Sequence, residues 1–172
     1  MCGVAGLMSM DKIDTKDVLA MTYCLAHRGP DAQNILLNSD ATVALGHTRL
    51  SVIDLSSRSN QPMSSVDGRY SIVFNGEIYN YKIIRERLLV LNNQLKFLTH
   101  SDTEVILQGY IQWGSNVCGM LEGMFAFVIF DAHRQELFIC RDRVGKKPLY
   151  YFHSRSLFAF ASEVKSLLKH PI

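Results

Sequence analysis

Short apolar runs and segments with helical spacing follow one another along the whole chain. Apolar runs bounded by turn residues are typical of buried strands and lie at residues 2–8, 34–38, 42–50, 70–74, 124–130, 136–141, 149–152 and 157–161. Apolar positions three and four apart predict helices at residues 15–27, 102–113 and 162–169, and another that follows Asn80 and ends near Leu91. By itself, this order of elements predicts an α+β fold.

Two polar stretches interrupt this pattern early in the chain. The first helix is expected to end at His27-Arg28-Gly29-Pro30-Asp31, because Pro30 disfavours the helical conformation in the residue before it. The polar side chains of this segment can donate hydrogen bonds, as residues that line a binding site often do. A plain turn that ends the helix explains the segment equally well. Residues 56–67, rich in Ser, Asn, Gln and Pro, form a polar loop that could cover a pocket.

Two charged residues stand at positions that favour a ligand or an internal partner. Arg49 interrupts an apolar stretch, and if it points inward it needs an anionic partner, which can be an internal carboxylate or a ligand. Asp102 stands at the start of the predicted helix 102–113, where either it or Ser101 can cap the helix. A carboxylate in this first turn could instead bind the ammonium group of a ligand.

The predicted strand 70–74 runs into Asn75-Gly76, which we interpret as a corner between a strand and a helix. The Asn75 amide can donate a hydrogen bond, and Gly76 permits close approach to the backbone, as an oxyanion pocket requires. Asn-Gly is also a common turn dipeptide, so a simple turn is the alternative.

Composition narrows the class of protein. The chain has 172 residues, of which 48% are hydrophobic and 20% charged, and this composition predicts one globular domain. A formal net charge of only +2 and the lack of a long basic run argue against a nucleic-acid partner. No apolar stretch approaches the roughly 20 residues that cross a bilayer, and the first residues lack a basic signal region, so we expect a cytoplasmic protein without membrane contact. The cysteines are widely spaced with no CxxC or Cys/His cluster, which argues against a zinc site and a disulfide scaffold.

Cys2 has two interpretations. Removal of Met1 would place a thiol and a free α-amine on one residue, and because an α-amine titrates near ~7.7–8.0 it can act as the base that activates the thiol. Otherwise, Cys2 is a small apolar residue at the start of a strand.

Several motifs occur together in a fixed order: Met-Cys-Gly, HRGPD, GHTRLSVID, NGEIYN, SDTE, GMFAF, RDRVGKKPLYY and ASEVKSLL. With them, the chain resembles the glutamine amidotransferase type 2 domain of glutamine-hydrolysing asparagine synthetases over essentially its whole length. This resemblance implies an N-terminal nucleophile (Ntn) hydrolase, a four-layer αββα sandwich with two mostly antiparallel sheets. It also implies that Cys2 hydrolyses L-glutamine to glutamate and ammonia through a thioester, while Asn75 and the Gly76 N–H hold the oxyanion.

The resemblance also assigns substrate contacts. Arg49 would bind the glutamine α-carboxylate through both oxygens, and Asp102 and Glu77 would meet its α-ammonium. Leu50 and Val52 would contribute backbone contacts, together with Asn75 and Gly76. His27, Arg28 and Asp31 are expected to shape the loop near the site.

The resemblance covers residues 2–172 as one glutaminase domain. Full-length relatives add an ATP-dependent synthetase domain, which takes up the ammonia and amidates aspartate or another carboxylate. We therefore expect a synthetase domain or subunit as partner, and a homodimer is also compatible with the resemblance. This half-reaction needs no metal or cofactor, and ATP and Mg²⁺ belong to the synthetase domain. The alternative is a non-catalytic module that senses glutamine or docks to a synthetase.

Overall fold

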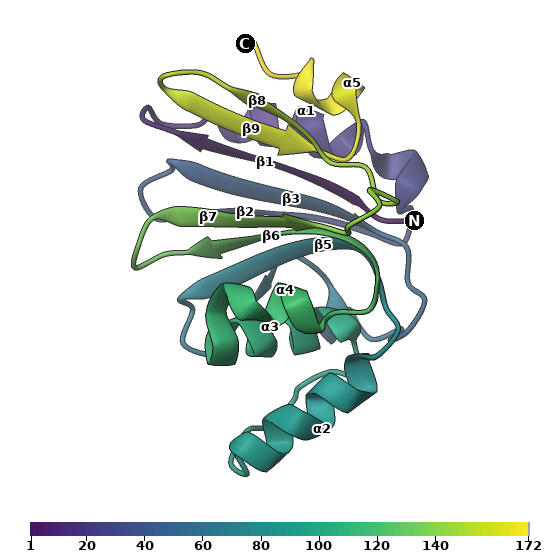
Figure 1. The fold of residues 1–172 in the computed structure, drawn as a ribbon. Coiled ribbons are helices and arrows are strands. Elements are labelled where there is room, and N and C mark those ends of the chain that lie inside the picture. Colours follow the sequence, from purple (N-terminus) through teal and green to yellow (C-terminus); the bar gives the residue numbers. More distant parts are fainter. Residues whose placement is uncertain (172) are drawn as a thin grey trace.

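The computed structural model describes residues 1–171 and contains two antiparallel sheets stacked between helices (Figure 1). Ile172, the last residue of the predicted domain 2–172, lies outside the described residues. One sheet has the order β2 (Ala32–Leu37), β3 (Val43–Arg49), β1 (Gly3–Ser9), β9 (Leu157–Ala161) and β8 (Tyr150–His153). The other has the order β4 (Met63–Ser64), β5 (Tyr70–Ile78), β6 (Gly123–Asp131) and β7 (Glu136–Arg141). β2 pairs with β3, and β6 pairs with β7, as antiparallel hairpins, and all four were predicted as strands.

Helices cover the outer face of each sheet (Figure 1). α1 (Thr15–Tyr23) and α5 (Val164–Leu167) lie against the first sheet. α2 (Tyr81–Leu91), α3 (Asp102–Trp113) and α4 (Val117–Met120) lie on the side of the second. Within residues 1–171, short 3₁₀ helices also occur at η1 (Ala26–Arg28), η2 (Ser57–Ser59) and η3 (Gly114–Asn116).

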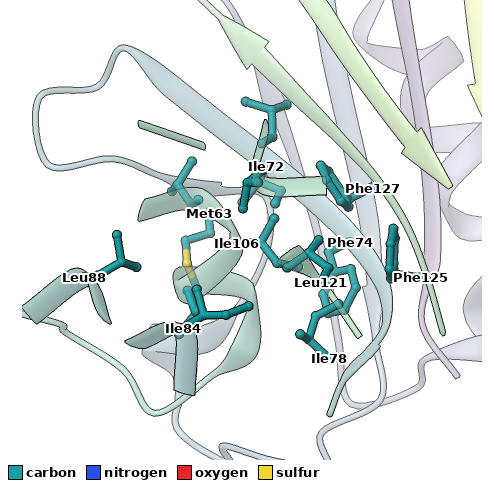
Figure 2. Packing of buried hydrophobic residues seen from close by; sticks show 14 residues of the cluster. Met63, Ile72, Phe74, Ile78, Ile84, Leu88, Ile106, Leu121, Phe125 and Phe127 are labelled. Atoms are coloured by element: carbon teal, nitrogen blue, oxygen red, sulfur yellow. The ribbon is translucent and has the colours of Figure 1, made fainter. Parts of the chain in front are cut away.

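Alternation along the strands creates three hydrophobic clusters from one chain. In β5, Val73 packs between the sheets, whereas Ile72 and Phe74 point to the other face and pack under the helices of the second sheet. Figure 2 shows this last cluster, where Phe127 of β6 joins the same layer. The third cluster lies between α1 and the first sheet. The result is a four-layer αββα sandwich, as predicted.

Two predicted helices are shorter than the sequence pattern indicated. The first ends at Tyr23 and continues as a 3₁₀ turn, because the Leu25 carbonyl accepts hydrogen bonds from Thr48 Oγ1 and the Arg28 N–H. The last, predicted at 162–169, is helical only at Val164–Leu167. Ser162 cannot start it, because its N–H and its hydroxyl are both bonded to the backbone of Val4 in β1.

The prediction of a strand-to-helix corner at Asn75-Gly76 is wrong. β5 continues to Ile78, and Asn75 and Gly76 lie opposite Ala126 and Phe125 of β6. Gly76 allows this pairing, since a Cβ atom there would lie 2.3 Å from the Met124 carbonyl oxygen. The corner therefore falls after Ile78, just before α2.

Candidate active site

A cavity of about 150 Å³ opens beside the N-terminus, where β1, β3, β5 and the start of α3 meet. All of the residues predicted from the sequence to act on or bind substrate line it: Cys2, Arg49, Leu50, Val52, Asn75, Gly76, Glu77 and Asp102. These residues come from four separate segments of the chain. Tertiary folding therefore brings the predicted set into one place, although the role of each residue stays a prediction.

Cys2 lies directly before β1 and is held by hydrogen bonds to its carbonyl and to its sulfur. Arg28 Nε donates a hydrogen bond to the Cys2 carbonyl at 2.9 Å, and the Leu50 N–H donates to Cys2 Sγ at 3.4 Å. Burial raises the pKa of the Cys2 thiol above its ordinary value. Met1 also lines the cavity, so removal of Met1 would enlarge the space in front of the thiol.

The Asn75 side chain faces the same cavity without a partner. It is 1% exposed, and neither its Nδ2 nor its Oδ1 has a hydrogen-bond partner among residues 1–171. A buried amide without partners costs free energy unless a ligand satisfies it. Its donor is thus available to an atom bound next to Cys2.

The Gly76 N–H lies on the open edge of β5. Both backbone groups of the opposite residue, Phe125, are bonded to Asp142, so Gly76 and Phe125 form a non-hydrogen-bonded pair. The N–H groups of Phe74 and Ile78, two residues to either side, point to this open edge and donate to side chains. The alternation of the strand places the Gly76 N–H between them, on the edge that faces the cavity.

Arg49 is buried, yet no carboxylate of residues 1–171 forms an ion pair with it. The internal salt bridge that the sequence left open is therefore absent from this part of the chain. Its guanidinium donates to the Ser56 carbonyl at 2.7 Å, to Asn60 Oδ1 at 2.6 Å and to the Asp54 carbonyl. All three acceptors are neutral, so the positive charge stays uncompensated beside the cavity.

Asp102 places a buried carboxyl group in the wall of the same cavity. The question of the α3 cap is settled by Ser101, whose Oγ accepts the Glu104 N–H. Asp102 Oδ2 instead accepts the Ile78 N–H at 3.0 Å. Burial, with a smaller contribution from the nearby Glu77 carboxylate, raises the pKa of Asp102 to about 6. A bound cation would relieve this unfavourable environment.

Leu50 and Val52 lie in the loop that follows β3, with Val52 71% exposed. Two carboxylates hold this loop: Asp31 accepts the Ser51 N–H at 2.7 Å, and Asp54 accepts the His100 N–H at 2.8 Å. Of the three HRGPD residues that the sequence predicted to shape the loop near the site, Arg28 and Asp31 bond to the backbone of Cys2 and Ser51. The third, His27, lies 3.0 Å from Glu163 Oε1 and does not line the cavity.

Comparison with known proteins decides the family. The family model described as a glutamine amidotransferase domain matches residues 1–172. The chain belongs to the glutamine amidotransferase domain family. It is 39% identical over 176 residues to asparagine synthetase [glutamine-hydrolyzing] 3 of Bacillus subtilis (strain 168), covering 99% of this chain and 28% of that protein. It is 41% identical over 144 residues to amidase chry2 of Gibberella zeae, covering 84% of this chain and 21% of that protein. The chain thus spans less than a third of the length of these relatives.

The fold agrees with that of solved amidotransferases. Glutamine phosphoribosylpyrophosphate amidotransferase from B. subtilis, complexed with ADP and GMP, superposes with a TM-score of 0.81 at 22% identity. The match covers 96% of this chain and 43% of that one. These comparisons confirm two predictions made from the sequence: the Ntn-hydrolase fold, and the resemblance to the amidotransferase domain of glutamine-hydrolysing asparagine synthetases.

Gln61 and Lys147 in the cavity wall and the nearby His47 were not predicted from the sequence as site residues. Gln61 joins β5 to α3, because its Oε1 accepts the Phe74 N–H at 2.6 Å and its Nε2 donates to Thr103. His47 is buried with Nε2 3.1 Å from the Phe74 carbonyl oxygen, and burial lowers its pKa to about 4. Lys147 also lines the cavity. A polar residue in the loop 56–67 was the only signal for Gln61, and the pattern gave none for the other two.

Residues 1–171 also show no membrane-spanning helix and no metal-binding cluster. No helix in this range is long and apolar enough to cross a membrane. Within the same residues, no group of three or more His, Cys, Asp or Glu side chains is arranged to hold a metal ion.

Proposed function

We propose that this amidotransferase domain hydrolyses L-glutamine to glutamate and ammonia, with Cys2 as nucleophile after removal of Met1. The observation that carries the proposal is the buried Asn75 amide, which lacks a partner and lies in the same cavity as Cys2. The same cavity is lined by Arg49, which is buried and pairs with no carboxylate of residues 1–171, and by Asp102, which is buried and has a raised pKa. These charges complement the α-carboxylate and the α-ammonium of an amino acid.

The chemistry follows from the groups on Cys2. Its α-amine takes the thiol proton, and the sulfur attacks the side-chain amide carbon of glutamine. The carbonyl oxygen becomes an oxyanion that accepts hydrogen bonds from Asn75 Nδ2 and the Gly76 N–H, each worth about 2.7–4 kcal/mol in such sites. The ammonium on Cys2 then returns the proton to the leaving nitrogen, and ammonia departs. Water attacks the thioester with the amine as base, which releases glutamate and restores the thiol.

Substrate binding uses the remaining residues. Arg49 can exchange its neutral acceptors for the α-carboxylate, a stronger acceptor that a guanidinium binds through two parallel hydrogen bonds. Asp102 and Glu77 receive the α-ammonium, while the backbone near Leu50 and Val52 closes the outer side of the cavity.

We further propose that the ammonia passes to an ATP-dependent synthetase domain or subunit. It would amidate aspartate or another carboxylate there, and ATP and Mg²⁺ would bind to that partner. The support is the similarity to a protein named asparagine synthetase [glutamine-hydrolyzing], of which this chain spans 28%. The glutaminase half-reaction itself needs neither cofactor nor metal.

The test combines intact mass with glutamate release on one sample. Protein that lacks Met1 should release glutamate from glutamine, and Cys2→Ala should bind glutamine without turnover. Cys24→Ala is the matched control and should keep full activity, since Cys24 is the C-cap of α1, its thiol donates to the Met21 carbonyl, and it does not line the cavity.

Two outcomes would contradict the proposal. Activity with Met1 still attached would remove the α-amine of Cys2 from the mechanism. Glutamine binding without glutamate release, in protein that lacks Met1, would favour a sensing or docking module instead.

A further inference from the structure

Lys147 is a buried cation that pairs with no carboxylate of residues 1–171. Its side chain lines the cavity and the residue is only 3% exposed, whereas the preceding Lys146 is exposed. Within residues 1–171 it forms no ion pair, and the hydrogen-bond partner of its Nζ is Met1 Sδ, at 2.7 Å. Burial, and then the nearby Arg28 charge, lower the pKa of Lys147. A buried ammonium group without a charged partner lowers the stability of the folded protein, so we looked to function for the reason that a lysine occupies this position.

The backbone of Lys147 is firmly held, which fixes where its side chain starts. The Asp142 carboxylate accepts the N–H groups of Lys146 and Lys147 at 2.8 and 2.9 Å. Arg141 Nε donates to the Lys147 carbonyl at 2.6 Å. These hydrogen bonds hold the loop after β7 in the conformation in which the Lys147 side chain lines the cavity that also holds Cys2.

Removal of Met1 takes away the thioether that contacts the ammonium. The same step creates the free α-amine of Cys2 in that part of the cavity. The cation would then face the two reacting groups of Cys2, the amine and the thiol. A positive charge disfavours a protonated amine and favours a thiolate.

The other charges around Cys2 are already matched by partners or by substrate. The α-ammonium of Met1 faces Cys2 and is lost with Met1. The other charged groups that face Cys2 or Lys147 are Arg28 from η1, Arg49 from β3, Glu77 from β5, Asp102 from α3 and Asp142 from the loop after β7. Arg28 is paired with Glu163 at 2.8 Å, and Asp142 is used by backbone N–H groups. Under the proposed function, the substrate carboxylate matches Arg49, and its ammonium matches Asp102 and Glu77. Lys147 keeps its charge uncompensated through the reaction.

We propose that Lys147 is a positioning residue whose buried charge keeps the α-amine of Cys2 neutral and favours the Cys2 thiolate. The inference rests on the proposed function, because it requires the N-terminal cysteine to react. It assigns to Lys147 a role that acts through Cys2 rather than through contact with glutamine.

The experiment compares Lys147→Met with Lys146→Met, which removes the same charge from an exposed neighbouring position. Each protein is treated with methionine aminopeptidase until its mass shows that Met1 is gone. The first readout is the pH profile of kcat/KM for glutaminase activity. The second is the pH dependence of Cys2 alkylation by iodoacetamide, measured on the N-terminal peptide by mass spectrometry, and it needs no turnover.

In Lys147→Met, the midpoints of both profiles should move to higher pH by about one unit, which slows the reaction about tenfold at a fixed pH on the acidic limb. Lys147→Arg should restore the original midpoints, and Lys146→Met should leave them in place. Lys147→Gln serves in the same way if the methionine variant does not fold. Unchanged midpoints with a lower plateau would overturn the inference and leave Lys147 a purely structural role. Failure of the proposed function looks different, since the wild type then releases no glutamate while its alkylation profile is still measurable.

Discussion

Replacement of Asp102 by asparagine should make the protein more stable while it loses glutamine binding. Asp102 is buried, and its pKa rises from the ordinary value of 3.8 to about 6, mainly because burial disfavours the charged form. An asparagine retains an oxygen that can accept the Ile78 N–H, so the hydrogen bond at the start of α3 can persist. The substitution therefore removes a buried charge with little change in packing.

The pKa values give the magnitude and the sign. The difference of 6 − 3.8 = 2.2 units corresponds to about 3 kcal/mol at about 1.36 kcal/mol per unit. Because the folded state holds the proton more tightly, the parent protein loses stability as pH rises from about 3.8 to about 6. Above that window, Asp102→Asn should be more stable by up to about 3 kcal/mol, or roughly 6–12 °C in Tm. Below it, the two proteins should be equal.

Urea unfolding at a series of pH values measures this difference. Asp131→Asn provides a control of opposite sign, because the hydrogen-bonded Arg69 lowers the pKa of Asp131 to about 2. The stability that ionised Asp131 contributes is complete above pH 3.8 and is lost as pH falls through 2, so this control should be less stable near neutral pH. In a Cys2→Ala background, which prevents turnover, glutamine should raise the Tm of the parent but not that of Asp102→Asn. A stability difference that does not change with pH, or an equal response to glutamine, would refute the assignment of Asp102.

Two further substitutions test the groups proposed to contact substrate. Asn75→Ala should lower kcat by on the order of 10²–10³ with a smaller effect on KM, because an oxyanion contact forms mainly in the transition state. Steady-state kinetics measure both constants, and a change confined to KM would contradict this role. Arg49→Lys should raise KM by about ten- to hundredfold, because a lysine cannot bind both carboxylate oxygens in the plane of a guanidinium. Arg58→Lys is the matched control and should leave KM unchanged, since Arg58 does not line the active-site cavity. An unchanged KM in Arg49→Lys would show that Arg49 does not bind the substrate carboxylate.

Asp102 and Arg49 mark the limit of what a pattern can establish. The sequence indicated that each is either an internal structural residue or a ligand contact. Whether Ser101 or Asp102 caps α3, and whether Arg49 meets a carboxylate, depends on which side chains reach them from distant segments. Hydropathy along a chain carries no information on such pairs.

Asn75 and Gly76 illustrate how a wrong local prediction can still identify the right atoms. Asn-Gly favours a turn locally, but pairing with β6 extends the strand through both residues. The donor edge that the cavity uses arises because β4 pairs with β5 only at Ile72 and Ser71, which leaves the edge near Gly76 open. That opening is a property of the sheet, and no local signal could reveal it.

The sequence by itself determined the family, the segments that carry the site, and the order of the strands and helices apart from β4 and α4, which the pattern did not predict. These features depend on local periodicity and on short motifs, which are present in the chain before it folds. Only the tertiary structure decided the burial of Lys147, the lack of partners at Asn75 and the raised pKa of Asp102. In each case, segments that are distant in sequence pack over a polar group and exclude water from it. This desolvation depends on the packed structure and cannot be read from the local sequence.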